Sequence, residues 1–565
     1  MGCSSSGGGS VGAHGVRAEG QREKCLRETC SYLKHSSQGH GFCCHACRTH
    51  GTHGPACQKV LAEGGRGPAL EKVPAAGARN ETTGAVAPEA SPGAFWQASL
   101  RFGRHAIGMD ESNGVTATET MHLVAHQGKL FASFGKWMSP EFVAKDFSKM
   151  QNFVGRLDSA GGKWVVDMQG QHESKHAARL SCLSSITWTR DCHGKELEPS
   201  VQALVVTFGL GKHGNFMMFR DDKDDSAPGT QHSWHQVKYA EQASDFTGGD
   251  TARAVLVHRD GVTGVDRIFA LQGTCGAVSG VYDPSSKNPG KVVWDSCPEK
   301  LDLASIGKAK RLPFRPLSMV AANGKLYLSS AGLILQRVDG ASPVWRVVVN
   351  MATLRPGDGK LNEAVGGIRG MTVVPNPVGS GSSVLFCWNP NERSKSRIHR
   401  ADPSQDGSSL NAPVEEASIN ALAKRYLGHE DLYYTLAAYN DMLETTVGTA
   451  QCNLIGFEVV VAGRAVDQLP LDPGQKVQEK SGKLLRGYWA GGGFAVRKGP
   501  DEYEVMEVGG PRNSASHVDP ALTAVRCYAN SPFPEEPGFV YFAGYDCNSF
   551  PSQDTAWIYK GRLAN

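Results

Sequence analysis

The sequence predicts an all-β protein, a β-propeller of about seven blades (alternatively about six), behind a small N-terminal module rich in cysteine and histidine. Two observations carry this prediction. Short segments with period-2 hydrophobic alternation follow one another from about residue 94 onward, and long helical periods are rare. The chain also contains 67 glycines and 29 prolines, as a fold with many short strands and turns requires.

Composition divides the chain into segments. We predict a disordered leader over residues 1–20, a Cys/His-rich module over 21–58, a flexible linker over 59–93 and the β-propeller over 94–565. The linker is rich in Ala, Gly, Pro, Glu and Arg and nearly lacks aromatic residues, a composition that cannot bury a core.

The leader matches a lipidation pattern. Met1-Gly2-Cys3 followed by serines predicts N-myristoylation at Gly2 and palmitoylation at Cys3. Two acyl chains would anchor the chain stably. The sequence leaves the compartment open, with the cytoplasm or, if the chain is acylated, the cytoplasmic face of a membrane as the options. The alternatives are a flexible leader that happens to begin Met-Gly, or an incomplete gene model. No apolar run reaches the roughly 18 residues of a membrane span, and no secretory signal is visible.

The module over 21–58 has few large apolar residues, so a core alone cannot hold it. Bound zinc or disulfides would have to stabilise it, and the sequence leaves both open. Cys44-x2-Cys47 has the spacing with which two thiolates bind one ion. The predicted zinc ligands are Cys25, Cys30, Cys44, Cys47, His53 and Cys57. The stretch from Gly41 to Cys57 resembles small Cys/His units of algal multidomain proteins, a resemblance that implies no particular activity.

One hairpin recurs through the long domain. Its clearest copies turn at Gln127-Gly128 and at Asn323-Gly324, the second a dipeptide favoured in two-residue hairpins. A third strand that ends in a charged turn follows, as in Phe216–Asp221 and Ile334–Gly340. A fourth strand begins near an aromatic residue: Trp164, Trp234, Trp294, Trp345 or Tyr503.

Four antiparallel strands per unit are typical of propeller blades. The blades are predicted near residues 119–170, 178–240, 252–297, 314–351, 368–430, 431–509 and 521–564. The last unit shows too few strands, so Ala94–Leu100 is expected to enter it as the outer strand and close the ring. Val414–Leu427 reads as helical where a fourth strand is expected, which keeps the smaller blade number open.

Several motifs resemble a family of uncharacterised bacterial β-propeller proteins. They are Val257–Ala270, Ser279–Pro284 and Phe542–Asn548 with Thr555–Ile558. The resemblance covers most of residues 94–565. It implies the propeller fold and brings no established activity with it.

The net charge of the chain argues against some classes of binding partner. A formal net charge of +3 on 565 residues is too small to argue for nucleic-acid or membrane-surface binding. The predicted partner is an anionic small molecule, a glycan or a protein. We expect no binding to nucleic acid. Membrane association is expected only through the predicted N-terminal lipid anchor.

Alignment of the units places an arginine near the start of the innermost strand in most of them. These residues are Arg179, Arg253, Arg315, Arg369 and Arg526, and Glu119 takes the corresponding place in the first unit. Innermost strands line the channel of a propeller, and guanidinium groups suit forked recognition of carboxylate, sulfate or phosphate. We therefore predict a binding protein that recognises an anionic ligand, an acidic glycan or a protein partner, at the channel mouth. Structural sealing of the ring by the same arginines is the alternative role.

Two histidines, His126 and His258, end first strands and are candidate ligand-binding residues. As general bases they would support the alternative function, a hydrolase or lyase that acts on an acidic sugar with the arginines holding the anion. As turn-closing residues they would have no chemical role. No complete acid–base pair can be assembled from the sequence, so binding is the preferred function and the catalytic residues stay open.

Two further patterns are predicted to be structural. The acidic run that includes Asp222 and Asp224 lacks the alternation of a calcium loop, so we expect a solvated hairpin tip. Cys182 with Cys192, or Cys275 with Cys297, has a spacing compatible with a disulfide, and buried free thiols are the alternative.

Overall fold

The structure is a computed structural model of the chain, which divides into two compact units, Met1–Pro88 and Glu89–Asn565. The described residues are 96–102, 107–109, 115–136, 152–169, 180–209, 214–224, 232–240, 252–272, 276–302, 316–358, 367–390, 396–427, 432–462, 487–508, 524–545 and 556–563. All of them belong to the second unit. The predicted lipidation sites Gly2 and Cys3 and the predicted zinc ligands from Cys25 to Cys57 lie outside them.

Four sheets are separate, and their neighbouring strands pair mostly antiparallel. One contains β6 (Cys182–Arg190), β7 (Glu196–Gly209), β8 (Asn215–Arg220) and β9 (Trp234–Ala240). The next contains β10 (Val255–Arg259), β11 (Asp266–Gln272), β12 (Gly276–Tyr282) and β13 (Val292–Trp294). A third contains β15 (Pro316–Ala322), β16 (Lys325–Ser330), β17 (Leu333–Val338) and β18 (Val344–Asn350), with β14 (Lys300–Asp302) parallel to β18. The fourth contains β19 (Gly367–Pro375), β20 (Ser382–Asn389), β21 (Arg397–Ala401) and β22 (Val414–Ser418).

The remaining strands form a 12-stranded sheet. Its members early in the chain are β1 (Trp96–Leu100), β2 (Glu119–His126), β3 (Lys129–Gly135), β4 (Phe153–Leu157) and β5 (Val165–Gln169). Its later members are β23 (Leu432–Val447), β24 (Ala450–Ala462), β25 (Gly487–Gly499), β26 (Glu502–Val508), β27 (Ala524–Asn530), β28 (Phe539–Tyr545) and β29 (Ile558–Arg562). Two of its joins, β2 to β28 and β24 to β27, consist of one residue pair each, so it is a chain of smaller sheets that touch at their edges.

Helices are short in the described chain. They are α3 (Met351–Leu354), α4 (Ile419–Leu427) and the 3-10 turns η5 (Asp222–Asp224), η6 (Pro289–Lys291) and η8 (Pro356–Asp358). None of the described helices has the length and apolar character needed to cross a membrane. The all-β class predicted from the alternation is confirmed for the part of the chain that the structure describes.

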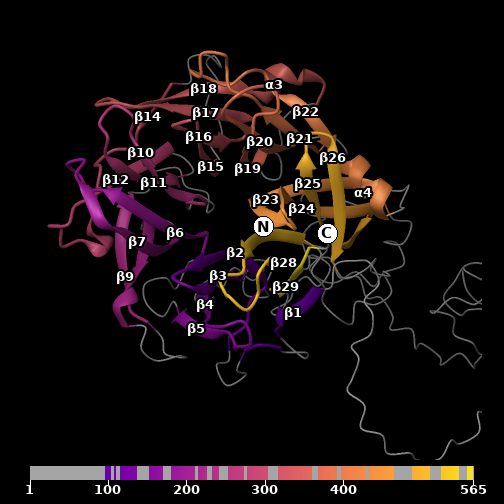
Figure 1. The fold of residues 1–565 in the computed structure, drawn as a ribbon, viewed down its shortest axis with the longest axis horizontal. Coiled ribbons are helices and arrows are strands. Elements are labelled where there is room, and N and C mark those ends of the chain that lie inside the picture. The colour runs from indigo at the N-terminus through magenta and orange to yellow at the C-terminus, as the bar shows by residue number, and fades with distance from the viewer. Residues whose placement is uncertain are drawn as a thin grey trace, which may run out of the picture. The chain divides into compact units, whose positions relative to one another are not determined.

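The strand that opens each run of antiparallel strands packs against the opening strands of its neighbours. These first strands are β2, β6, β10, β15, β19, β23 and β27. Contacts connect β2 to β6, β6 to β10, β10 to β15, β15 to β19, β19 to β23, β23 to β27 and β27 back to β2. In Figure 1 the labelled members β2, β6, β10, β15, β19 and β23 succeed one another from indigo through magenta to orange. Residues far apart in the sequence therefore meet where the first strands lie together.

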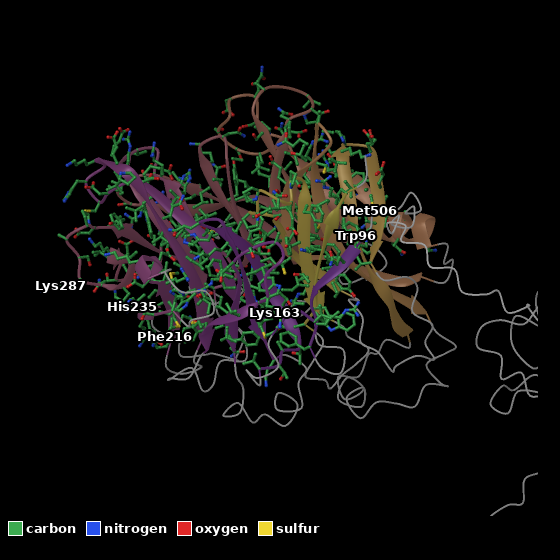
Figure 2. The ribbon with its side chains drawn as sticks, turned by 60° about the horizontal axis from the view of Figure 1, so that its bottom comes forward. Trp96, Lys163, Phe216, His235, Lys287 and Met506 are labelled. Carbon is green, nitrogen blue, oxygen red and sulfur yellow. The ribbon has the colours of Figure 1, made fainter. Side chains whose placement is uncertain are left out.

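The N-terminal strand closes the last sheet, as predicted. β1 pairs antiparallel with β29, with Trp96 opposite Gly561, so it covers the edge that β29 would otherwise expose. Trp96 packs its ring at 4.9 Å from Phe542 and 5.6 Å from Phe494. Met506 joins the same apolar cluster, and Figure 2 shows it beside Trp96.

Local sequence explains the hairpin turns. Gln127 and Gly128 have φ of 46° and 74°, and Asn323 and Gly324 have φ of 52° and 69°. Successive positive φ values are those of a type I′ turn, whose twist matches the flanking strands. The two predicted turns are confirmed.

The prediction for Val414–Leu427 was partly wrong. Val414–Ser418 forms β22, which pairs with β21, and the helix α4 begins only at Ile419. The expected fourth strand is therefore present, and the helix follows it. Residues Ile419 and Ala423 are buried in an apolar cluster, so the helix packs as an addition to this sheet.

Buried acids join consecutive parts of the fold through an arrangement that we call the clasp. In each clasp a carboxylate accepts hydrogen bonds from an arginine and from an aromatic side chain on the strand that follows it. Asp167 and Glu416 each bind a second arginine as well, Arg156 and Arg400. Asp167 accepts from Arg220 and Trp234, Glu299 from Arg337 and Trp345, and Glu416 from Arg497 and Tyr503. The arginines lie on β8, β17 and β25, and the aromatic residues on the strands that follow. The charged third strands and aromatic fourth strands of the sequence repeat thus share a structural role.

Candidate active site

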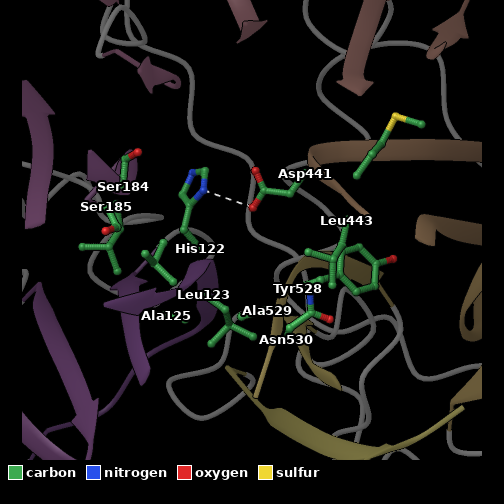
Figure 3. Close-up of a pocket in the computed structure, with 13 residues that line it drawn as sticks. His122, Leu123, Ala125, Ser184, Ser185, Asp441, Leu443, Tyr528, Ala529 and Asn530 are labelled. Carbon is green, nitrogen blue, oxygen red and sulfur yellow. Dashed lines mark ion pairs between the residues drawn. The ribbon is translucent and has the colours of Figure 1, made fainter. Parts of the chain in front are cut away.

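A cavity of about 460 Å³ lies between the first strands β2, β6, β23 and β27. Its polar lining residues are His122, Ser184, Ser185, Asp441, Tyr528 and Asn530, and aliphatic side chains complete the wall (Figure 3). This volume is within the range of small-molecule sites, in which a few polar groups converge on an otherwise apolar lining.

Irregular pairing in two strands brings His122 and Asp441 together. The register of β2 against β3 shifts at Met121, directly before His122. The register of β23 against β24 shifts between Ala437 and Met442, a stretch that includes Asp441. Such bulges turn a side chain away from the regular alternation. As a result Nδ1 of His122 lies 3.2 Å from Oδ2 of Asp441, although the two strands belong to distant parts of the chain (Figure 3).

The backbone determines which nitrogen of His122 exchanges its proton. Nε2 lies 3.0 Å from the carbonyl oxygen of Ser181, which can only accept, so Nε2 carries a hydrogen. The exchangeable proton of this pair therefore lies at Nδ1, next to the carboxylate of Asp441. The His122 side chain is 5% exposed and the Asp441 side chain 34%, so the pair is buried on one side and open to the cavity on the other. Together the two groups can take up or release one proton at the cavity wall.

Tyr528 contributes its ring to the cavity and not its hydroxyl. Figure 3 shows the phenol oxygen directed away from His122 and Asp441. Burial holds the pKa of Tyr528 well above its ordinary value. Gly456 makes room for this ring, because an added Cβ would lie 2.5 Å from the phenol oxygen and 2.2 Å from the carbonyl oxygen of Val525. Tyr528 is therefore a packing residue in this structure.

The thiols near the cavity are protonated. Burial first, and then the charge of Asp441, raises the pKa of Cys182 and Cys527 well above the ordinary value. Cys182, Cys192 and Cys297 are all free, so both suggested disulfides are wrong. The alternative of a buried free thiol is confirmed for Cys182 and not for Cys192 or Cys297, which are half-buried and exposed. The other partner, Cys275, lies outside the described residues.

His126, a predicted site residue, stands in a chain of hydrogen bonds at the same cavity. Its Nδ1 lies 2.8 Å from Oγ of Ser185, and its Nε2 lies 3.0 Å from Oδ2 of Asp222. Asp222 also accepts from Nη1 of Arg220 at 2.6 Å. The prediction of a solvated tip is wrong for Asp222, whose side chain is only 16% exposed because it is held between His126 and Arg220. Burial acts to raise the pKa of Asp222, but these two hydrogen bonds outweigh burial and lower it.

The predicted arginines do not line the cavity where the structure describes them. Arg253, Arg369 and Arg526 are buried, with exposures of 6%, 1% and 1%. Arg526 forms an ion pair with Glu119, which is fully buried, so two predicted ligand-binding residues bind each other. Arg179 and Arg315 lie outside the described residues.

His258, the other predicted histidine, lies apart from the cavity lining. Its Nε2 is 3.8 Å from Oδ2 of Asp339, and both side chains are 6% exposed. Asp339 in turn contacts Arg337 of the second clasp. Among the residues that the structure describes, no group of three or more His, Cys, Asp or Glu side chains is arranged to hold a metal ion.

Sequence reasoning missed His122, Asp441 and Ser185. A histidine within a strand and an isolated aspartate carry no motif, and their proximity depends on the two bulges. The only local signal was the pair of histidines in Met121–His126, where the sequence analysis singled out the second and passed over the first.

No family model matches the chain, and a search of curated proteins finds no match. The resemblance to a bacterial propeller family therefore stays a prediction.

Among solved structures, the chain is similar to a Trypanosoma rangeli sialidase in complex with 2,3-difluorosialic acid, at 10% identity and a TM-score of 0.35. This likeness covers 83% of the present chain and 59% of the sialidase, so the chain spans less than two thirds of that enzyme. A second similar structure is the polysaccharide lyase Uly1, at 9% identity and a TM-score of 0.38, covering 85% of this chain and 94% of the lyase. A third is the catalytic domain of a Coprinopsis cinerea GH62 α-L-arabinofuranosidase, at 11% identity and a TM-score of 0.28, covering 67% and 96%. All three TM-scores are below 0.5, so these similarities assign no function to the chain.

Proposed function

We propose that the protein is an enzyme, a hydrolase or lyase that acts on an acidic sugar, with the cavity between β2, β6, β23 and β27 as its active site. The observation that supports this proposal is the ion pair of His122 and Asp441, 3.2 Å apart in the wall of that cavity. A cavity of about 460 Å³ has room for a sugar residue.

The pair acts by acid–base catalysis. Ser181 holds the Nε2 hydrogen of His122, so Nδ1 and the Asp441 carboxylate share the proton that is exchanged with substrate. With the proton removed, the Asp441 carboxylate accepts a proton from substrate or from water. With the proton present, the pair donates it to a leaving oxygen. Positioned acid–base groups of this kind contribute about 10²–10⁴-fold to rate.

The same geometry favours catalysis over anion binding by an arginine collar. Anion binding by a ring of arginines would require guanidinium groups that are open to a ligand. Arg253, Arg369 and Arg526 are buried, and Arg526 is paired with Glu119. His122 with Asp441 is instead an ion pair at a cavity that can exchange one proton with a substrate, and the sequence had not indicated it.

The test is a screen of the full chain on uronate-containing and neutral polysaccharides. New reducing ends would report cleavage, and an unsaturated product that absorbs in the ultraviolet would distinguish a lyase from a hydrolase. On an active substrate, Asp441→Asn should lower kcat by about 100-fold or more because the shared proton loses its carboxylate.

The matched control is His258→Asn, which removes one member of a His–Asp pair outside the cavity lining. It should leave kcat within about twofold of the unmodified protein, apart from any loss of stability. Full activity in Asp441→Asn would remove His122 and Asp441 from the mechanism.

The fold proposal is a closed propeller of about seven blades for the unit Glu89–Asn565. Its support is the cycle of first-strand contacts that returns from β27 to β2, together with the entry of β1 beside β29. The presence of β22 removes the irregularity that had favoured a smaller number.

A further inference from the structure

We propose that Ser185 is a nucleophile activated by His126 and Asp222, and that the cavity hydrolyses small carboxylic esters. This inference does not depend on the proposed sugar-cleaving function, because it uses neither His122 nor Asp441. It rests on three linked groups: the Ser185 hydroxyl, the imidazole of His126 at 2.8 Å, and the Asp222 carboxylate at 3.0 Å from the other ring nitrogen.

The hydrogen-bond partners determine which atom donates and which accepts in the series Ser185–His126–Asp222. Asp222 is ionised at neutral pH, since its pKa is lowered, and a carboxylate can only accept. Nε2 of His126 must therefore carry the hydrogen that Asp222 receives. In a neutral imidazole this leaves the lone pair on Nδ1, so Ser185 Oγ donates to it. That is the polarity which activates a serine hydroxyl: the base faces the hydroxyl, and the acid orients the base.

The Ser185 hydroxyl and the groups that support it differ in exposure, as a nucleophilic site requires. Ser185 is exposed and lines the cavity, whereas His126 is 3% exposed. Asp222 is held by Nη1 of Arg220 at 2.6 Å, and Arg220 in turn bonds the fully buried Asp167 of the first clasp. A rigid, buried support thus fixes the orientation of the imidazole while the hydroxyl stays accessible to a ligand.

The chain contains its own comparison for the structural role of such a histidine. His258 is the penultimate residue of β10 and His126 the last of β2, and Asp339 follows Arg337 with the spacing by which Asp222 follows Arg220. At this second position the His–Asp distance is 3.8 Å, against 3.0 Å for His126 and Asp222. Nε2 of His258 makes no hydrogen bond within the part of the chain that the structure describes. The short His–Asp contact and a serine hydrogen bond therefore occur together at His126, and the short contact does not recur at His258.

The reaction is a two-step acyl transfer to water. Oγ of Ser185 forms a bond to the acyl carbon while its proton passes to Nδ1 of His126. The ester C–O bond then breaks, and the alcohol leaves with that proton. Water next adds to the acyl carbon and gives a proton to Nδ1, after which the Ser185 ester bond breaks, the serine recovers the proton and the carboxylic acid departs. A cavity of about 460 Å³ has room for a small acyl group of an ester.

The experiment uses the full chain and a fluorophosphonate probe, which reacts covalently with activated serine hydroxyls. Peptide mapping after labelling should find the adduct on Ser185, and p-nitrophenyl acetate should be hydrolysed. Ser185→Ala should abolish both. His126→Asn should slow labelling and hydrolysis by about 100-fold or more, because it removes the base. Ser184→Ala is the matched control, since Ser184 also lines the cavity but donates its hydroxyl hydrogen to the carbonyl oxygen of Val255.

Circular dichroism of each variant would show that the fold is retained. If His126→Asn fails to fold, Asp222→Asn replaces it, and the expected loss of labelling is again at least about tenfold. Absence of a Ser185 adduct, or equal labelling of the unmodified protein and the base variants, would overturn the proposal. Labelling of Ser185 is measured without any polysaccharide, so the test remains independent of polysaccharide cleavage.

Discussion

Arg220 of β8 donates from Nε to Oδ2 of Asp167 on β5 at 2.9 Å, and this ion pair connects two sheets. The Arg220 side chain is 1% exposed and that of Asp167 is 0% exposed. Buried charges are tolerated only when they are paired and hydrogen-bonded. Trp234 supplies a further donor to Asp167 at 3.1 Å. The same combination of acid, arginine and aromatic donor recurs at Glu299 and Glu416, so removal of one partner should be costly wherever the clasp occurs.

The clasp predicts a large loss of stability for Arg337→Met. Arg337 is 1% exposed and contacts Glu299, Asp260 and Asp339, so its removal leaves buried carboxylates without their cation. We expect a loss of about 3–5 kcal/mol in the free energy of unfolding, measured by urea denaturation. The control is Arg355→Met, because Arg355 pairs with Glu415 at the surface and should cost about 1 kcal/mol or less. Equal losses in the two variants would refute a structural role for the clasp.

His399 predicts a pH dependence of stability. It is fully buried and stacks on Phe386 at 5.5 Å. Burial first, and then the charges of Arg355 and Arg397, lowers the pKa of His399 to about 3. The folded protein therefore keeps this ring neutral at pH values where the unfolded chain, with an ordinary pKa of about 6.5, binds a proton. Stability should fall as the pH drops below about 6.5, by up to about 1.4 kcal/mol per pH unit from this residue.

The measurement is the urea midpoint of His399→Phe between about pH 7 and pH 5, above the range in which carboxylates titrate. The phenyl ring keeps the stacking on Phe386 and cannot bind a proton, so the decline should be shallower than in the unmodified protein. His235→Phe serves as the control, since the His235 side chain is 56% exposed. An unchanged slope in His399→Phe would mean that this ring does not couple folding to pH.

A side chain at position 456 should disturb the packing beside the cavity. An added Cβ would lie 2.2 Å from the carbonyl oxygen of Val525, which is backbone and cannot rotate away. Gly456→Ala should therefore cost about 2–3 kcal/mol of stability, measured by thermal unfolding. Gly499→Ala in the same sheet is the control, because its nearest neighbour would be Glu502 at an ordinary 3.9 Å, and it should be close to neutral.

β1 should stabilise the last sheet, although it lies far from the other strands of that sheet in the sequence. Trp96→Ala removes a ring that packs on Phe494 and Phe542, and we expect a loss of about 2 kcal/mol. Gln97→Ala in the same strand changes an exposed side chain and should be nearly neutral. If the Trp96 variant kept full thermal stability, β1 would add no measurable strength to the closure.

Local patterns predicted much of the fold because strands and turns are local. The alternation located most strands, and the Asn323-Gly324 dipeptide located a type I′ turn from residues adjacent in the chain. The unpaired outer position of the last unit even predicted that β1 would join β29. The prediction was incomplete at Val414–Leu427, where the short strand β22 precedes the helix and the helical pattern concealed it.

The candidate site required the tertiary structure. His126 was proposed from its place at the end of a strand, but its partners come from elsewhere in the chain, Ser185 from β6 and Asp222 from the 3-10 turn η5. The sequence alignment proposed arginines near the starts of the first strands, but only the packing shows that Arg526 is paired with Glu119.

The sequence by itself thus determined the all-β class, the hairpins, the repeated Arg-and-aromatic strands and the closure by β1, since each depends on residues close together in the chain or on one unpaired edge. Only the tertiary structure decided which charged groups meet. His122 and Asp441 approach each other because two bulges turn them out of the regular alternation, and Ser185 reaches His126 because β2 packs against β6. Bulges and the packing of one sheet on another arise from contacts between distant segments, and no local pattern of residues encodes them.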